Sequence, residues 1–226
     1  LDYDTSFKPA AQDALYEPNE FRTSDHDAVL VGLDLTNLPP TVEVNGPYVT
    51  MVNTPVLLSA VGYDPEGKEL TYAWDFDNDG LFDDDAGADA WFTSDVTGIF
   101  PVAVQVTDFG GLTAVDSTYV IVYDPAGLFV TGGGWISAPE GKGEFSFDAK
   151  YVKKNPYPVA AVSYLIADTG LYFTGTSYDW LVVAERDSWL HGTGSFNGMA
   201  GYIFLLSAVD GSEKLGGDGI DRFRIQ

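Results

Sequence analysis

The chain has 226 residues, of which 45% are hydrophobic, with no cysteine and a formal net charge of −23 at pH 7. This length and apolar content exclude disorder of the whole chain and suffice for one large or two to three small β domains, while the lack of cysteine excludes disulfides and thiolate metal sites. The charge argues against nucleic-acid binding through this chain, because a polyanion needs clustered Lys and Arg, and it favours hard cations as partners.

The first predicted element is a β-strand at residues 28–35, in the stretch FRTSDHDAVLVGLDL (21–35). Val29, Val31 and Leu33 alternate with other residues, as one face of a strand requires. No apolar run in the chain approaches the roughly 18 residues that a membrane span needs, so no membrane partner is expected.

Residues 1 to about 35 resemble the end of a known enzyme domain. LDYDTSFKP together with ALYEPNEFRTSDHDAVLVGLDL is similar to the C-terminus of the endonuclease/exonuclease/phosphatase superfamily, in particular of large secreted bacterial nucleases that carry further β domains. The resemblance implies that Asp25 helps to hold the metal and that His26 acts as the base, although Ala28 replaces the proline that often closes the motif.

A working nuclease is nevertheless not expected from this chain. The superfamily's other metal and phosphate residues lie upstream, and a general base acts only beside them. We therefore expect Asp25 and His26 to be an inactive remnant and the chain not to be an enzyme. Magnesium would belong to the missing nuclease domain of a metal-dependent parent.

Two breaks divide the rest of the chain. Pro39 and Pro40 favour an extended linker, and Pro125 with the glycines at 132–134 interrupts strand-like patterning. We predict a remnant at 1–38, one β domain at 39–124 and a second at 125–226. Charge supports the second boundary, since residues 1–140 carry 24 acidic and 3 basic side chains and residues 141–226 carry 10 and 8.

The segment 39–124 has the pattern of a β-sandwich. TPVLLSAVGY, LTYAWDF, FPVAVQVTD and AVDSTYVIVY are short runs rich in β-branched and aromatic residues, separated by Gly, Asp and Asn. No stretch of the chain has a sustained helical period, so the whole protein is predicted to be all-β.

This segment also resembles a named family. GPY (46–48), DPEGKELTYAWDFDNDG (64–80) and GIFPVAVQVTDFGG (98–111) are similar, in order and spacing, to the polycystic kidney disease (PKD) domain, an immunoglobulin-like sandwich. The resemblance implies that Trp74 is the core tryptophan of a central strand and that Gly46 and Pro47 lie at the turn after the first strand. It also implies binding or spacing rather than catalysis.

The stretch DFDNDGLFDDD predicts a calcium site. Asp75, Asp77 and Asp79 alternate before Gly80, with Asp83 further on, and this spacing matches the opening of a D-x-D-x-D-G loop. Ala86 occupies the position of the usual bidentate Glu, for which Asp84, Asp85 or Asp89 could substitute. The alternative is a solvated acidic hairpin without an ion.

Residues 125–226 contain about seven strand candidates, several alternating apolar with polar residues, which predicts a β-sandwich or a flattened barrel. VTGGGWI, SYDWLVV, GTGSFNG and GGDGIDRFRI resemble the post-COAP type of C-terminal domain, which implies a fold but no established activity. His191 is predicted to be a turn residue. Two readings remain for the aromatic residues, namely sugar stacking and, more strongly, core packing; they are Trp135, Tyr178, Trp180, Trp189 and Tyr202.

The predicted function is a non-catalytic, calcium-stabilised adhesion or spacer region of a secreted nuclease, located outside a bacterial cell or on its surface. Its partner would then be cell-surface or matrix material. A second hypothesis is a filament subunit, in which residues 28–35 add as a strand to a sheet edge of the next chain and build a head-to-tail polymer. A third is a nuclease fragment with residual metal-dependent activity.

Overall fold

The computed structural model describes residues 36–153 and 155–226, and all of its extended elements in this part are β-strands, with one short 3-10 helix at Glu213–Leu215. The prediction of an all-β protein is confirmed. The predicted strand at 28–35 and the remnant site residues Asp25 and His26 lie outside the described residues. Residues 37–226 form one compact unit.

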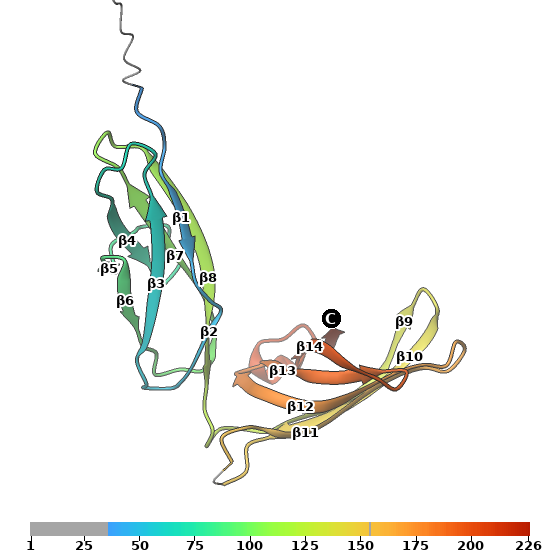
Figure 1. Ribbon diagram of the computed structural model, residues 1–226. Coiled ribbons are helices and arrows are strands. Elements are labelled where there is room, and N and C mark those ends of the chain that lie inside the picture. Colours follow the sequence, from blue (N-terminus) through green and yellow to red (C-terminus); the bar gives the residue numbers. More distant parts are fainter. Residues whose placement is uncertain (1–35, 154) are drawn as a thin grey trace, which may run out of the picture. The chain divides into compact units, whose positions relative to one another are not determined.

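Two sheets come from the first half of this unit (Figure 1). The smaller sheet has the strand order β1-β3-β6, with β1 (Thr41–Val44), β3 (Val56–Tyr63) and β6 (Asp89–Phe92). The larger has the order β2-β8-β7-β4-β5, with β2 (Tyr48–Met51), β4 (Thr71–Asp75), β5 (Asp85–Ala86), β7 (Gly98–Thr107) and β8 (Thr113–Tyr123).

The two sheets enclose a common core, so this part is a β-sandwich. Leu58 on β3 and Trp74 on β4 are both completely buried, and the indole Nε1 of Trp74 donates a hydrogen bond to the carbonyl of Gly87 at 2.9 Å. Burying an indole requires a partner for its N–H, and the loop carbonyl supplies it. The buried members of the core are Leu58, Ala60, Trp74, Ala90, Phe92, Val102, Val104, Val120 and Val122.

Trp74 is thus a core residue, as expected, but its strand is not the middle one. β4 lies between β7 and the two-residue β5, next to the sheet edge. Gly46 and Pro47 lie in the turn between β1 and β2, joined by a cis peptide bond, and β2 then pairs in parallel with β8.

The second half forms one antiparallel sheet of seven strands in the order β15-β14-β13-β12-β11-β10-β9 (Figure 1). Its strands are β9 (Val130–Ala138), β10 (Gly141–Lys150), β11 (Val159–Ile166), β12 (Leu171–Ala184), β13 (Asp187–Phe196), β14 (Met199–Val209) and β15 (Arg222–Ile225). The predicted boundary between residues 124 and 125 falls between β8 and β9, in the connection to this sheet.

The seven-stranded sheet curls on itself. Phe145 on β10 stacks on Phe223 on β15, although these strands lie near opposite ends of the strand order. Within the described residues β9 and β15 each pair with one strand, so hydrogen bonds do not close the curl. The prediction was a sandwich or a flattened barrel. The single curled sheet is closer to the barrel, but its edge strands β9 and β15 are not joined to each other by backbone hydrogen bonds.

Burial alternates along β10, and this alternation defines the two faces of the curled sheet. Phe147 and Ala149 are buried on the inner face, whereas Asp148 between them is exposed. The inner face carries the core residues Phe147, Ala149, Val162, Phe173, Leu181, Leu190, Phe204 and Leu206. Among the described residues, no helix is long and apolar enough to cross a membrane.

Candidate metal centre

The acidic loop begins where β4 ends. Asp75 is the last residue of β4 and only 3% exposed, because β7 pairs with β4 up to this position. The chain then leaves the sheet and returns at Asp84, whose backbone N–H donates to the carbonyl of Trp74 at 3.1 Å. This return places Asp84 beside the end of β4.

The Asp75 carboxylate organises the loop. Its Oδ1 accepts the N–H of Asn78 at 2.6 Å, and its Oδ2 accepts the N–H of Gly80 at 3.0 Å. Asn78 and Gly80 have φ angles of 59° and 88°, a region that favours Asn and Gly. A carboxylate has about four acceptor sites, so the two N–H donors leave lone pairs of Asp75 available.

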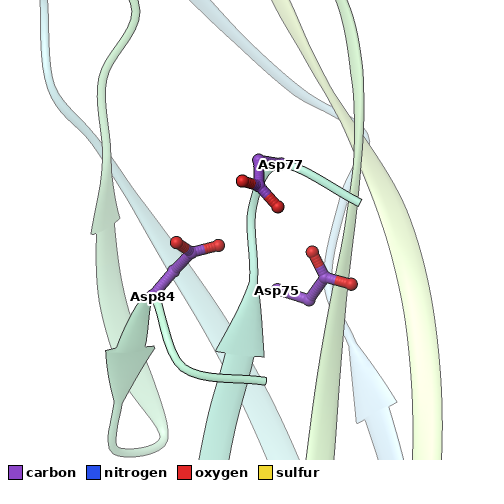
Figure 2. A group of neighbouring side chains, drawn as sticks. All are labelled: Asp75, Asp77 and Asp84. Carbon is purple, nitrogen blue, oxygen red and sulfur yellow. The ribbon is translucent and has the colours of Figure 1, made fainter. Parts of the chain in front are cut away.

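Three carboxylates converge at this point (Figure 2). One oxygen each from Asp75, Asp77 and Asp84 lies within 4.8 Å of the others. Calcium binds oxygens at about 2.3–2.6 Å, so two of its ligands can be at most about 5 Å apart. The three oxygens therefore fit the first shell of one calcium ion.

The group overlaps with the predicted ligand set but differs from it. Asp75 and Asp77 are members, whereas Asp79 and Asp83 are not, and Asp84 takes part instead. Asp79 turns its Oδ1 to the N–H of Leu81 at 2.7 Å. Asp83 is exposed and makes no hydrogen bond within the described part of the chain.

Of the three residues that could replace the bidentate Glu, the structure brings Asp84 to the group. Its Oδ2 accepts the N–H of Phe76 at 2.6 Å, which fixes the side chain toward the loop. Asp85 instead accepts the N–H of Trp91 at 3.3 Å, and Asp89 lies outside the group. The spacing of the loop could not decide among them, because the choice depends on how the chain returns to β4.

Charge makes this arrangement costly without a cation. Carboxylates about 4 Å apart repel by about 1–4 kcal/mol per pair at effective dielectric constants of 80 to 20. Asp77 and Asp84 are exposed, so water weakens their repulsion and could also complete the shell of an ion. The chemistry that the group supports is the binding of a hard cation through oxygen atoms.

The aromatic residues of the second half divide into two sets. Trp180 is 8% exposed and Tyr178 and Trp189 are partly buried, whereas Trp135 and Tyr202 are 61% and 44% exposed. Core packing therefore accounts for Trp180, whereas sugar stacking stays open to the exposed Trp135 and Tyr202.

The prediction that His191 is a turn residue is wrong. It lies within β13, opposite Trp180 on β12, and its ring stacks on the Trp180 ring with centroids 5.4 Å apart. Its Nδ1 is 2.8 Å from Oδ2 of Asp179. The following Gly192 lets β13 lie close to β12, because a Cβ there would lie 2.1 Å from the carbonyl oxygen of Ser177.

Comparisons with known proteins do not assign this chain to a family. No family model matches the chain, and no curated protein matches it. A solved carbohydrate-binding module of the β-sandwich superfamily is 13% identical, with 84% of each chain covered and a TM-score of 0.34.

Two further solved structures come from Bacteroides. The protein SGBP-B of the mixed-linkage glucan utilization locus of Bacteroides ovatus, solved with a mixed-linkage heptasaccharide, is 10% identical over 84% of this chain and 70% of that one, with a TM-score of 0.27. A quinonprotein alcohol dehydrogenase-like protein of Bacteroides thetaiotaomicron is 7% identical over 79% and 59%, with a TM-score of 0.26. All of these TM-scores lie below 0.5, so the likenesses carry no conclusion about ligands.

Proposed function

We propose that this chain is a non-catalytic, calcium-stabilised binding or spacer region that works outside a bacterial cell or on its surface. The observation that carries the proposal is the convergence of Asp75, Asp77 and Asp84 at the end of a core strand. The resemblance of residues 1–35 to the end of a nuclease domain supports a position C-terminal to such a domain, whose catalytic residues would lie upstream.

Calcium is the cation that suits this group best. All three candidate ligands are carboxylates, two of them on a loop outside the sheet, and calcium accepts six to eight oxygens in flexible geometry. Magnesium demands a near-ideal octahedron and holds its waters more tightly. A site with few protein ligands in an extracellular module is expected to bind calcium with a Kd on the order of 10⁻⁴ to 10⁻³ M.

The ion would stabilise the loop between β4 and β5. Phe76 at the start of this loop packs against the core, but Leu81 further along is 58% exposed, and hydrogen bonds to the Asp75 carboxylate hold the turn between them. An ion that binds the folded state alone adds stability of RT ln(1 + [Ca²⁺]/Kd), which is about 0.4 to 1.4 kcal/mol when calcium is at one to ten times Kd.

Thermal unfolding in calcium and in chelator tests the proposal. Calcium should raise the Tm of the wild type, and the double variant Asp77→Asn with Asp84→Asn should lose most of the rise. Asp79→Asn is the matched control, because Asp79 lies in the same loop but outside the group. Equal melting curves in calcium and chelator would reject the proposal, and so would a control variant that loses the rise equally.

The filament hypothesis stays a prediction. β9 and β15 are edge strands within the described residues and offer main-chain groups for strand addition by residues 28–35 of another chain. Electron microscopy of the intact chain and of a variant lacking residues 1–37 tests it. Filaments that persist after the deletion, or an intact chain that stays monomeric, would reject strand donation.

A further inference from the structure

The outer face of the seven-stranded sheet carries a row of four side chains across four strands. Trp135 on β9 lies opposite Glu144, Glu144 opposite Leu165 on β11, and Leu165 opposite Tyr172 on β12. We call these four residues the aromatic row. Trp135, Leu165 and Tyr172 are 61%, 37% and 42% exposed, so the row presents apolar surface to solvent.

The row is long and has an aromatic ring at each end. Three strand spacings of about 4.8 Å separate Trp135 from Tyr172, which gives roughly 14 Å. Lys142 places its Nζ 5.4 Å from the centroid of the Trp135 ring and forms an ion pair of 2.9 Å with Glu144. These contacts orient the indole at the sheet edge while most of it stays exposed.

A second row runs beside the first and consists of hydroxyl groups. Ser146 lies opposite Ser163, Ser163 opposite Thr174, and Thr174 opposite Ser195. Two residues along each strand separate this hydroxyl row from the aromatic row, a distance of about 7 Å. In the described part of the chain, none of the four hydroxyls has a hydrogen-bond partner in the protein. They are available to a ligand.

The charged side chains of β10, one of the four strands of this face, balance one another. The outward side chains of β10 include Lys142, Glu144, Asp148 and Lys150, whose formal charges sum to zero, and two of them already pair with each other. The chain as a whole carries −23 and would repel a polyanion. β10 therefore offers a ligand no excess charge, which suits an uncharged ligand.

We propose that the outer face of β9–β12 binds a neutral, extended polysaccharide that lies across the strands. A pyranose ring has an apolar face of C–H groups, which suits an aromatic ring, and a rim of hydroxyls, which suits Ser and Thr side chains. One sugar ring is too short to reach both Trp135 and Tyr172, so the ligand is a chain. Protein–protein interfaces, by contrast, are depleted in Ser and Glu, which this face carries.

Affinity electrophoresis of the full chain tests this proposal, with hydroxyethyl cellulose, xyloglucan and galactomannan as neutral extended probes. At least one of them should slow the protein, in calcium and in chelator alike. Trp135→Ala and Tyr172→Ala should each weaken binding roughly tenfold, as the loss of one aromatic contact predicts. Trp135→Phe should retain most of it.

The matched control is Trp91→Ala. Trp91 lies on β6 in a different sheet and is 62% exposed, almost as much as Trp135, so its removal should leave binding unchanged. The proposal is overturned if no neutral probe slows the protein, if only the anionic alginate or the coiled starch does so, or if Trp135→Ala binds as the wild type does. Since the expected binding does not need calcium, the metal proposal can fail without affecting this one.

Discussion

The rings of Phe145 and Phe223 stack with centroids 3.8 Å apart and planes inclined by 5°. Phe145 lies on β10 and Phe223 on β15, and no backbone hydrogen bonds join these strands. Phe147 adds a second contact to Phe223 at 5.7 Å. Side-chain packing, rather than a hydrogen-bonded ladder, therefore holds the two ends of the curled sheet together.

The first prediction follows from this packing. Phe223→Ala removes the ring that joins the two ends and should lower the free energy of unfolding by about 2 kcal/mol or more, since a partly buried aromatic ring and its stacking are both lost. Urea unfolding followed by circular dichroism measures the change. Phe129→Ala is the control, because Phe129 is 66% exposed, and an equal effect of both variants would contradict a closing role for Phe223.

Local pattern was enough to predict the strands but not how they meet. Alternation along residues 141–150 identifies which side chains of β10 are buried, because period two is a local property. The contact between Phe145 and Phe223 depends on sheet curvature, which the alternation does not encode. The same limit applies to the acidic loop, where spacing indicated Asp75 and Asp77, and the return of the chain to Trp74 brings in Asp84.

The glycines of β9 provide a second prediction. A Cβ at Gly132 would lie 2.5 Å from Cζ of Phe147, a buried ring on the neighbouring strand, so Gly132→Ala must displace the core. A loss of about 1–3 kcal/mol is expected, as for other overpacked cores. Gly134→Ala is the control on the same strand and face, because its Cβ would meet Phe145 at an ordinary 3.4 Å. Equal stability of the two variants in urea would show that the Phe147 ring moves aside freely.

Asp75 should stabilise the protein even without a metal ion. In chelator, Asp75→Asn should lower the free energy of unfolding by roughly 1–3 kcal/mol, because an amide can accept through one oxygen only and leaves the N–H of Asn78 or Gly80 without its acceptor. Asp83→Asn is the control, since Asp83 is exposed. If Asp75→Asn matches the wild type in chelator and differs only in calcium, the carboxylate acts as a ligand alone.

The pair of Asp218 and Arg222 predicts a titration in the acid range. Two hydrogen bonds of 2.5 and 3.1 Å join the guanidinium to the carboxylate, and Arg222 lowers the pKa of Asp218 to about 2. An unperturbed Asp has a pKa of about 3.9, so the folded state holds the ionised form more strongly than the unfolded state does. The pair therefore contributes to stability above about pH 4, and this contribution is lost as the pH falls through 2.

Carbon NMR of the Asp218 carboxyl group measures this pKa directly. Arg222→Gln should raise the midpoint toward about 4, because the charged donor is lost while the chain remains folded. Arg224→Gln is the matched control, since Arg224 lies on the same strand and is not among the causes of the lowered pKa. Both side chains of the pair are about half exposed. Molar salt should therefore screen the charges and raise the wild-type pKa of Asp218 part of the way toward 4. A wild-type midpoint near 4 at low salt would show that the ion pair does not persist in solution.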